Sequence, residues 1–258
     1  MYKLGALPPR YDPRTIKLTS ILLQGVVPPT PDAFNVDVSL NLHIDNPMYG
    51  NDAWGDCVIA ARAHMTRRFE GYEQKIAIPI QTAEVLTEYW KEQGVPMPKC
   101  WARVFHNMPD GGLNGLDSLK AWRKGWQAGK KVYSIYAFAA INSQHHDEIF
   151  ASLAYLRGDY VSIALPVTAQ KQDVWDVVSG PGSDPGSRGY HMVYRLAYDK
   201  NLGRITFVTW GGLKQMTLAF NDKYVVEDYA VVDNRDNFLT NSPVDVTALS
   251  NILTQITS

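Results

Sequence analysis

The sequence predicts one large α+β domain in which helices come first and a β-sheet follows. Two observations carry this prediction: apolar residues recur at helical spacing up to residue 157, and short runs of period two or of β-branched residues begin at residue 160. We place the domain at residues 34–240, with a helical lobe at 34–158 and a β lobe at 159–240. The order of the elements thus predicts two structurally different lobes.

Four helices are expected in the first half, at residues 57–70, 83–92, 116–126 and 145–157. In the leading helix, Asp56 is the expected N-cap and Gly71 the expected stop, because these residue types favour helix ends. One face of this helix carries apolar side chains that are expected to be buried: Val58, Ala61, Met65 and Phe69.

Strands are expected at residues 34–38, 160–165, 191–198, 204–210, 216–220 and 228–232. A stretch rich in glycine and proline, residues 179–189, separates the first two strands of the β lobe. It is long enough to be a loop of a functional site.

The chain ends are expected to lie outside this domain. Residues 1–33 hold six prolines and little apolar sequence, so we expect an extended arm that wraps the domain or a partner. Residues 241–258 are expected to be a C-terminal tail. The role of both segments is left open by the sequence.

Composition narrows the possible partners. The formal net charge is −1 and no basic run stands out, so a nucleic-acid partner is not expected. No apolar run is long enough to span a bilayer and the N-terminus lacks a signal-peptide pattern, so we expect a soluble product, cytoplasmic as synthesised. The two cysteines, Cys57 and Cys100, are not a disulfide framework, and Cys100 is expected to be a buried small hydrophobe.

Cys57 stands where a nucleophilic thiol would be expected. It follows the polar turn NDAWGD, residues 51–56, and opens the leading helix. The unpaired N–H groups of a helix's first turn stabilise a thiolate and lower the thiol pKa. Asp56 acts in the opposite direction, because a neighbouring carboxylate raises the thiol pKa unless it is engaged in capping.

With these motifs and this order of lobes, the chain resembles the papain-like cysteine peptidases. Asn51 and Gly55 hold the offsets that a glutamine and a glycine have before the nucleophile in that family, and His191 opens a strand after a glycine-rich loop, as the family's histidine does. The resemblance implies a papain-like α+β fold in which the cysteine helix of the N-terminal lobe packs on an antiparallel sheet of the C-terminal lobe.

One position departs from the family pattern. The family's Asn-Ser-Trp-Gly is matched here by VTWG, residues 208–211, so that Val208 replaces the asparagine that orients the histidine. Valine cannot hydrogen-bond an imidazole, and Thr209 or Asp199 could substitute. A closer likeness is to mostly uncharacterised phage and bacterial proteins that carry a GNDxxGDC motif, a later histidine and VTWG.

These residues suggest the roles of an acyl-transfer site. Cys57 would attack, His191 would take up and return the proton, and the Asn51 amide would join the Cys57 backbone N–H in an oxyanion hole, although Asn51 can equally be a turn residue. Thr209 is the fourth candidate for the catalytic group, and Trp210 would shield the histidine from water. The expected substrate-binding positions are Trp54, Gly55, Gly112, Gly189 and Trp210.

Three functions are compatible with the sequence. The first is a thiol hydrolase of peptide or amide bonds with a Cys57/His191 dyad. The second is a non-catalytic structural protein, such as a virion component, that contacts neighbouring virion proteins through its arm. A transglutaminase-like acyl transferase would use the same dyad with another acceptor. No spacing of His, Cys, Asp or Glu suggests a metal site, and no cofactor is expected.

Overall fold

An eight-stranded sheet forms the centre of the protein. The structure, a computed structural model, describes residues 2–20, 22, 28–95 and 108–233. The strands of the sheet are β1 (Ala33–Asn35), β4 (Ile135–Ala140), β5 (Asp159–Leu165), β6 (Val174–Trp175), β7 (Gly189–Asp199), β8 (Arg204–Thr209), β9 (Gly212–Thr217) and β10 (Val225–Asp233). Their order is β4-β10-β5-β7-β8-β9-β6, and β1 also pairs with β7. All pairs are antiparallel except β6 with β9.

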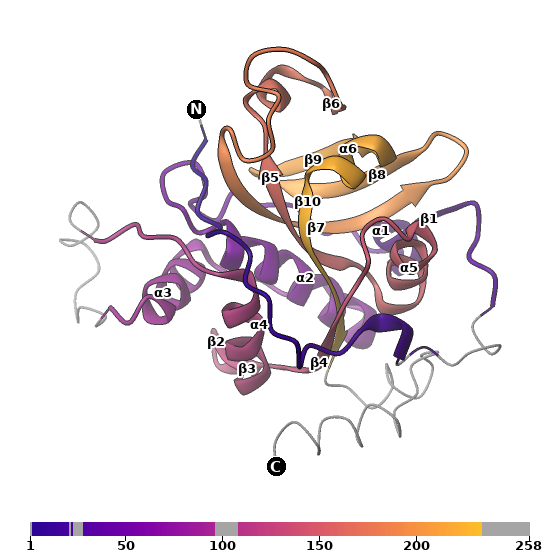
Figure 1. Ribbon diagram of the computed structural model, residues 1–258. Helices are drawn as coiled ribbons and strands as arrows, with labels where there is room; N and C mark the ends of the chain where they lie inside the picture. The colour runs from indigo at the N-terminus through magenta and orange to yellow at the C-terminus, as the bar shows by residue number, and fades with distance from the viewer. Residues whose placement is uncertain (1, 21, 23–27, 96–107, 234–258) are drawn as a thin grey trace.

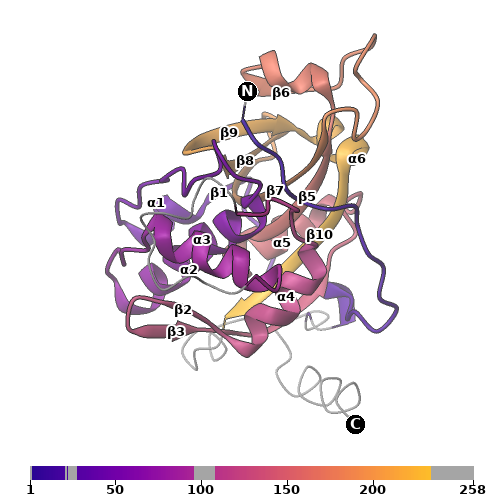
Figure 2. The ribbon, with the colours of Figure 1, turned by 90° about the vertical axis from the view of Figure 1, so that its left-hand side faces the viewer.

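The helices are α1 (Val36–Leu40), α2 (Cys57–Gln74), α3 (Thr82–Glu92), α4 (Gly115–Lys124), α5 (His146–Ala151) and α6 (Leu218–Tyr224). Figure 1 shows α2 running along one face of the sheet, and Figure 2 shows α3 and α4 gathered on the same side. Every residue of α2 from Cys57 to Gly71 is buried, because the helix lies between the sheet and the other helices. The predicted α+β fold, with the cysteine helix packed on the sheet, is confirmed.

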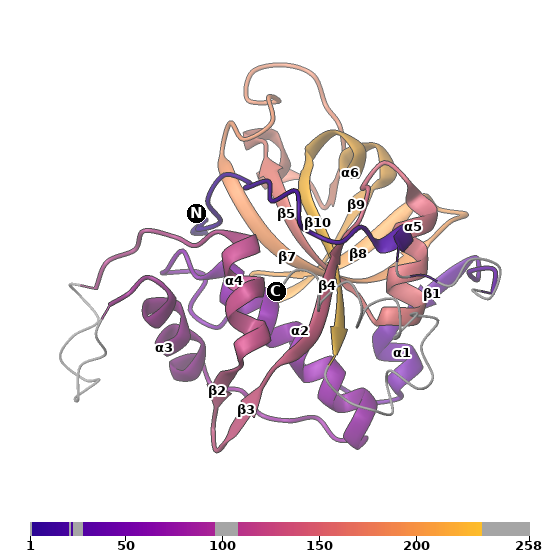
Figure 3. The ribbon, with the colours of Figure 1, turned by 60° about the horizontal axis from the view of Figure 1, so that its bottom comes forward.

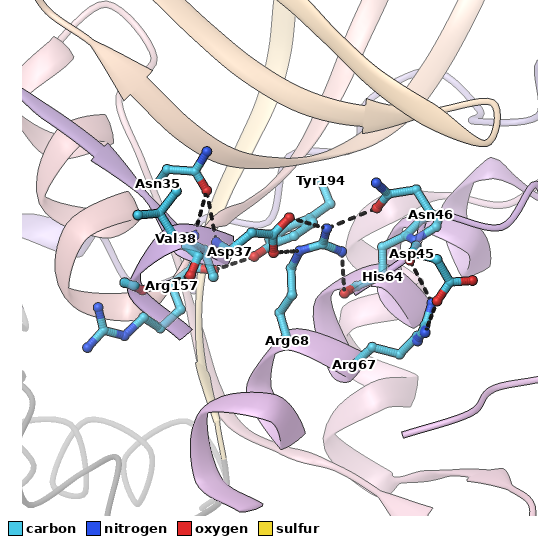
Figure 4. Close-up of polar contacts among 12 residues, drawn as sticks. Asn35, Asp37, Val38, Asp45, Asn46, His64, Arg67, Arg68, Arg157 and Tyr194 are labelled. Atoms are coloured by element: carbon cyan, nitrogen blue, oxygen red, sulfur yellow. Dashed lines mark hydrogen bonds and ion pairs between the residues drawn. The ribbon is translucent and has the colours of Figure 1, made fainter. Parts of the chain in front are cut away.

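A buried arginine fastens α2 to the segment that precedes it. Arg68 forks onto Asp37 of α1 with two contacts of 2.8 Å and donates to the Asn46 side chain at 2.9 Å. Its guanidinium also lies over the ring of Tyr194 of β7, 5.4 Å from the ring centre. Figure 4 shows these groups converging from α1, from the loop that follows α1, and from α2 and β7. This ion pair therefore fixes the start of the loop that leads to Cys57.

Two predicted strands end earlier than expected because a polar side chain starts a helix inside each. The strand predicted at 34–38 ends at Asn35, whose side chain accepts the N–H groups of Asp37 and Val38 and caps α1. The strand predicted at 216–220 ends at Thr217, whose hydroxyl accepts the Phe220 N–H at 3.0 Å and caps α6. The β half thus contains a helix that the sequence did not predict.

Helix ends differ from the predictions as well. Helix α2 continues through Gly71 to Gln74 and stops where Lys75 takes a left-handed conformation, with φ 58°. The helix predicted at 116–126 ends at Lys124. The helix predicted at 145–157 is α5 followed by a π-helical turn at Ser152–Leu156.

Three strands lie within the predicted helical lobe and were not predicted. Strand β4 joins the central sheet beside β10, and β2 (Trp126–Ala128) pairs with β3 (Lys131–Tyr133) in a separate hairpin. The central sheet therefore takes strands from both sides of residue 158.

The described part of the N-terminal arm lies against its own domain. Ile16 and Leu18 are buried, and the Ala140 N–H donates to the Ile16 carbonyl at 2.7 Å. Figure 3 shows this indigo segment crossing the molecule toward α5. The C-terminal tail at 241–258 and Cys100 lie outside the described residues.

Candidate active site

Cys57 is the first residue of α2 and ends a tightly wound turn. The N–H groups of Ala53 and Trp54 both donate to the Gly50 carbonyl at 2.9 Å, and Gly50 itself has a left-handed φ of 94°. Asp56 is the N-cap of this helix, and its carbonyl accepts the N–H groups of Ile59 and Ala60. This geometry presents the Cys57 side chain at the start of the helix, as the sequence predicts.

The Cys57 thiol is enclosed. Only 1% of the residue is exposed, and the backbone N–H of Met192 donates to its sulfur at 3.4 Å. Burial raises the pKa of Cys57 to about 11, while nearby backbone N–H groups, of Met192, Gly5 and Ala6, lower it in part. The expected lowering of the thiol pKa by the helix start is therefore outweighed by burial in this arrangement.

His191 lies one residue before the N–H group that contacts the Cys57 sulfur. Its Nε2 is 2.7 Å from the hydroxyl oxygen of Thr209, and its Nδ1 has no hydrogen-bond partner among the described residues. The ring of Trp210 stacks on the imidazole, with centres 4.3 Å apart and planes 14° apart. Burial and the nearby Arg188 lower the pKa of His191 to about 3, so the ring is neutral at neutral pH.

The sequence offered two substitutes for the missing asparagine, and Thr209 is the one that contacts His191. Asp199, the other substitute, lies eight residues further along β7 from His191 and accepts the N–H of Leu202 in the following turn. Val208 is buried and pairs with Tyr194 across β7 and β8. The structure therefore brings Thr209, and not Asp199, to the imidazole.

Asn51 and Asp56, two polar residues of the turn before Cys57, are both buried. The Asn51 side-chain amide donates to the Trp54 carbonyl at 3.1 Å, which is the turn role that the sequence left open. Asp56 is buried, its side chain makes no capping hydrogen bond, and burial raises its pKa well above the usual value. The Asn51 side chain lowers that pKa in part. Asp56 is thus the N-cap residue of α2, as predicted, but without a side-chain cap, and its carboxylate raises the thiol pKa of Cys57.

A second wall of the site comes from the segment around Gly112. Asp110 accepts the Gly55 N–H at 2.7 Å and the Tyr89 hydroxyl at 2.6 Å, and that hydroxyl in turn accepts the Gly112 N–H at 3.1 Å. Trp54 packs edge-on against Trp90 behind this wall. Sequence reasoning singled out Gly55, Gly112 and Trp54. It missed Asp110 and Tyr89, and the only local signal for them is that Asp110 directly precedes a glycine pair.

The N-terminal segment, residues 2–7, runs between two walls, which are the turn before Cys57 and the segment around Gly112. Leu113 donates to the Gly5 carbonyl and accepts the Leu7 N–H, both at 2.8 Å, while Ala6 forms a bridge with Tyr190 on the opposite side. Ala6 is itself buried. The segment therefore covers Cys57 as a short extra strand.

The start of the segment is held at Trp210. The ring of Tyr2 stacks on Trp210 with centres 5.1 Å apart, and the indole N–H of Trp210 donates to the Lys3 carbonyl at 3.2 Å. Arg188 donates to the Tyr2 carbonyl at 3.0 Å, and the Leu4 side chain reaches Gly189. Both Gly189 and Trp210, predicted to bind substrate, thus contact the N-terminal segment.

Beside Trp210 lies a pocket of about 490 Å³. Tyr2 and Leu4 form one side of it, and Trp175 and Trp210 contribute aromatic surface. Three cationic side chains also line the pocket: Lys171, Arg188 and Lys214. The pocket continues the groove that holds the N-terminal segment.

No known protein-family profile matches the sequence, and no curated protein shows significant sequence similarity to it. Solved structures do resemble it. Xylellain, a cysteine protease from Xylella fastidiosa, superposes with a TM-score of 0.66 at 15% identity, covering 91% of this chain and 97% of that chain. The fold is papain-like. A cysteine protease of Carica candamarcensis gives a TM-score of 0.54 at 13% identity over 80% of this chain and all of its own, and the bromelain protease of Ananas comosus 0.53 at 10% over 79% and all of its own.

This papain-like fold sets the frame for the chemistry of the site. Within the described residues, no group of three or more His, Cys, Asp or Glu side chains could hold a metal ion. No helix of the described ranges is long and apolar enough to cross a membrane. The site itself places the Cys57 thiol against the backbone N–H of Met192, the residue that follows His191.

Proposed function

We propose that this protein is a cysteine hydrolase of peptide or amide bonds, with Cys57 as nucleophile and His191 as base. The observation that carries the proposal is the placement of the two groups. The sulfur contacts the N–H of the residue after His191, and Thr209 occupies one imidazole nitrogen while the other is left without a partner. A nucleophile, a base and an orienting group are the elements of such a site.

The reaction would proceed in two steps. His191 Nδ1 takes the thiol proton while Sγ bonds to the substrate carbonyl carbon, and the amine then leaves with that proton as the C–N bond breaks. Water, deprotonated by the same nitrogen, releases the acid from the thioester and restores the thiol. The Cys57 backbone N–H would stabilise the oxyanion, and the second N–H of the Asn51 amide could join it while the first stays on the Trp54 carbonyl.

We further propose that the described arrangement is a latent form. The N-terminal segment fills the groove, and burial beneath it holds the thiol protonated and the imidazole neutral. Substrate would enter after residues 2–7 leave the groove. Trp54, Gly55, Gly112, Gly189 and Trp210 would then contact substrate in place of the segment.

A non-catalytic scaffold, for example a virion component, is the second candidate. The observation that favours it is the same enclosure of Cys57, since a thiol with a raised pKa beneath a docked segment is unreactive. Against it stands the docking of the described arm residues on their own domain, which leaves this stretch engaged and not free for a neighbour. A transglutaminase-like transferase would share the first step and differ in its acceptor.

The test is peptide-bond hydrolysis by the full chain with a destabilised N-terminal segment. The Gly5→Ala variant is incubated with an unfolded protein substrate, and new termini are identified by mass spectrometry. We expect cleavage that is abolished by adding either Cys57→Ala or His191→Gln. Cleavage that survives Cys57→Ala would contradict the proposal, as would no cleavage by a variant in which Cys57 is shown to be accessible.

A further inference from the structure

Three glycines approach one another closely where the N-terminal segment passes Cys57. Gly5 of the N-terminal segment lies between Gly55 of the cysteine turn and Gly112 of the opposite wall. A Cβ atom added to Gly5 would lie 1.7 Å from the Gly55 carbonyl oxygen and 2.4 Å from its Cα. Because these are backbone atoms, no side-chain rotation can make room for the Cβ.

Each wall also lies close to the segment when measured from its own glycine. A Cβ on Gly112 would lie 2.4 Å from the Gly5 carbonyl oxygen, and a Cβ on Gly55 would lie 3.0 Å from the Gly5 Cα. The walls are also tied together, because Asp110 accepts the Gly55 N–H and, through Tyr89, is linked to the Gly112 N–H. The gap is therefore bounded by a hydrogen-bonded frame within the domain, and the N-terminal segment also contacts this frame, because Lys3 pairs with Asp110 at 3.5 Å.

The gap lies at the reacting sulfur. The N–H groups of Gly5 and Ala6 are near enough to Cys57 to lower its thiol pKa. A residue whose carbonyl carbon is attacked by Cys57 has its Cα one bond from that carbon, so this Cα must lie in or next to the space that Gly5 occupies. This holds for a chain entering in either direction.

We propose that the site selects substrates with glycine as the residue that donates the acyl group to Cys57, so that cleavage follows a glycine. The proposal rests on the proposed thiol function and narrows its substrate class. A larger side chain at this position would clash with the Gly55 backbone, and contacts at such short distances are strongly unfavourable.

The test compares peptide chloromethyl ketones on the full-length Gly5→Ala chain. The reagents are acetyl-Leu-Gly-, acetyl-Leu-Ala- and acetyl-Leu-Phe-chloromethyl ketone, with iodoacetamide as a small reference. In each ketone the sulfur–carbon bond forms as chloride leaves, and the thiol proton passes to His191 and then to solvent. Mass spectrometry of digested protein assigns the label to Cys57 or to Cys100. Gly212→Ala, at a glycine with open space around it, is the control for substitution near the site.

We expect the glycine reagent to label Cys57 at least about tenfold faster than the alanine reagent, and the phenylalanine reagent to be slower still. Equal rates for glycine and alanine would overturn the glycine selectivity and leave the thiol function standing. Labelling by iodoacetamide without labelling by any ketone would also overturn the selectivity. Failure of all four reagents would overturn the proposed function itself.

Discussion

The hydroxyl oxygen of Thr209 lies 2.7 Å from Nε2 of His191, so that Thr209, and not its neighbour Val208, contacts the imidazole. It leaves Nδ1 as the imidazole nitrogen without a partner in the described part of the chain. A hydroxyl has one rotatable hydrogen and two lone pairs, so it can accept from a neutral or a protonated imidazole. In the proposed reaction, Thr209 would act through His191, as a positioning residue.

Replacing Thr209 tests that role. Thr209→Val keeps the shape and removes the hydroxyl, so we expect kcat/KM of the Gly5→Ala chain to fall about tenfold, the effect of one buried hydrogen bond. The acidic limb of the pH profile should move to lower pH, because the imidazolium loses an acceptor and the pKa of His191 falls. Thr209→Ser keeps the hydroxyl and should retain most of the activity. Equal activity of Val and Ser variants, with unchanged pH profiles, would exclude an orienting role.

Displacing the N-terminal segment should expose the thiol. Gly5→Ala places a methyl group against the Gly55 backbone and should release residues 2–7 from the groove. We expect iodoacetamide to modify Cys57 at least about tenfold faster than in the wild-type chain, since burial is what raises the thiol pKa. Tyr11→Ala is the matched control, because Tyr11 lies on the same arm and is 90% exposed. A wild-type rate in Gly5→Ala would show that the segment does not protect the thiol.

Acidification should loosen the closed arrangement. The pKa of His191 is lowered to about 3 in the folded protein, whereas an unfolded histidine titrates near 6.5. The folded state thus binds fewer protons between these values, so its stability should fall as pH drops from about 6.5 toward 3. His191→Gln should flatten this part of the curve of unfolding free energy against pH. A slope that is identical in the variant would assign it to other groups.

The buried ion pair between Arg68 and Asp37 should be essential to stability. The Arg68 side chain is fully buried and Asp37 is largely covered, so removing one partner leaves an uncompensated charge. Arg68→Ala should lower the free energy of unfolding by about 3–5 kcal/mol, measured by denaturant titration. Arg14→Ala is a suitable control, because that arginine pairs with Asp12 at an exposed position. A loss below 1 kcal/mol for Arg68→Ala would contradict this account of the loop anchor.

The sequence was most informative where periodicity is strong. The helix at Cys57 and the strands β5, β7 and β10 follow from apolar spacing, and the cysteine and histidine could be placed on them. Strand β4, with the sequence IYAFAA, was missed because alanine favours helices, although its residues alternate between buried and half-buried positions. Only pairing with β10 makes this segment a strand.

Parts of the site depend on contacts between distant segments and could not be predicted. Thr209 and Asp199 were equal candidates in the sequence, and only the sheet register separates them. The contacts among Gly5, Gly55 and Gly112 join three segments far apart along the chain. The docking of residues 2–7 over Cys57 likewise depends on the folded walls, although the sequence did indicate an arm.

The most direct test of the proposed dyad is the pH dependence of Cys57 alkylation in the full-length Gly5→Ala chain. The rate of iodoacetamide labelling, assigned to Cys57 by peptide mapping, is measured from about pH 4 to about pH 10, with and without His191→Gln. This interval spans the usual pKa values of both histidine and cysteine. A Cys57/His191 pair predicts a rate that persists on an acidic limb well below the usual thiol pKa and loses this limb in the His191→Gln variant. A single titration at the pKa of an ordinary thiol, the same with and without His191→Gln, would contradict the proposed Cys57/His191 pair.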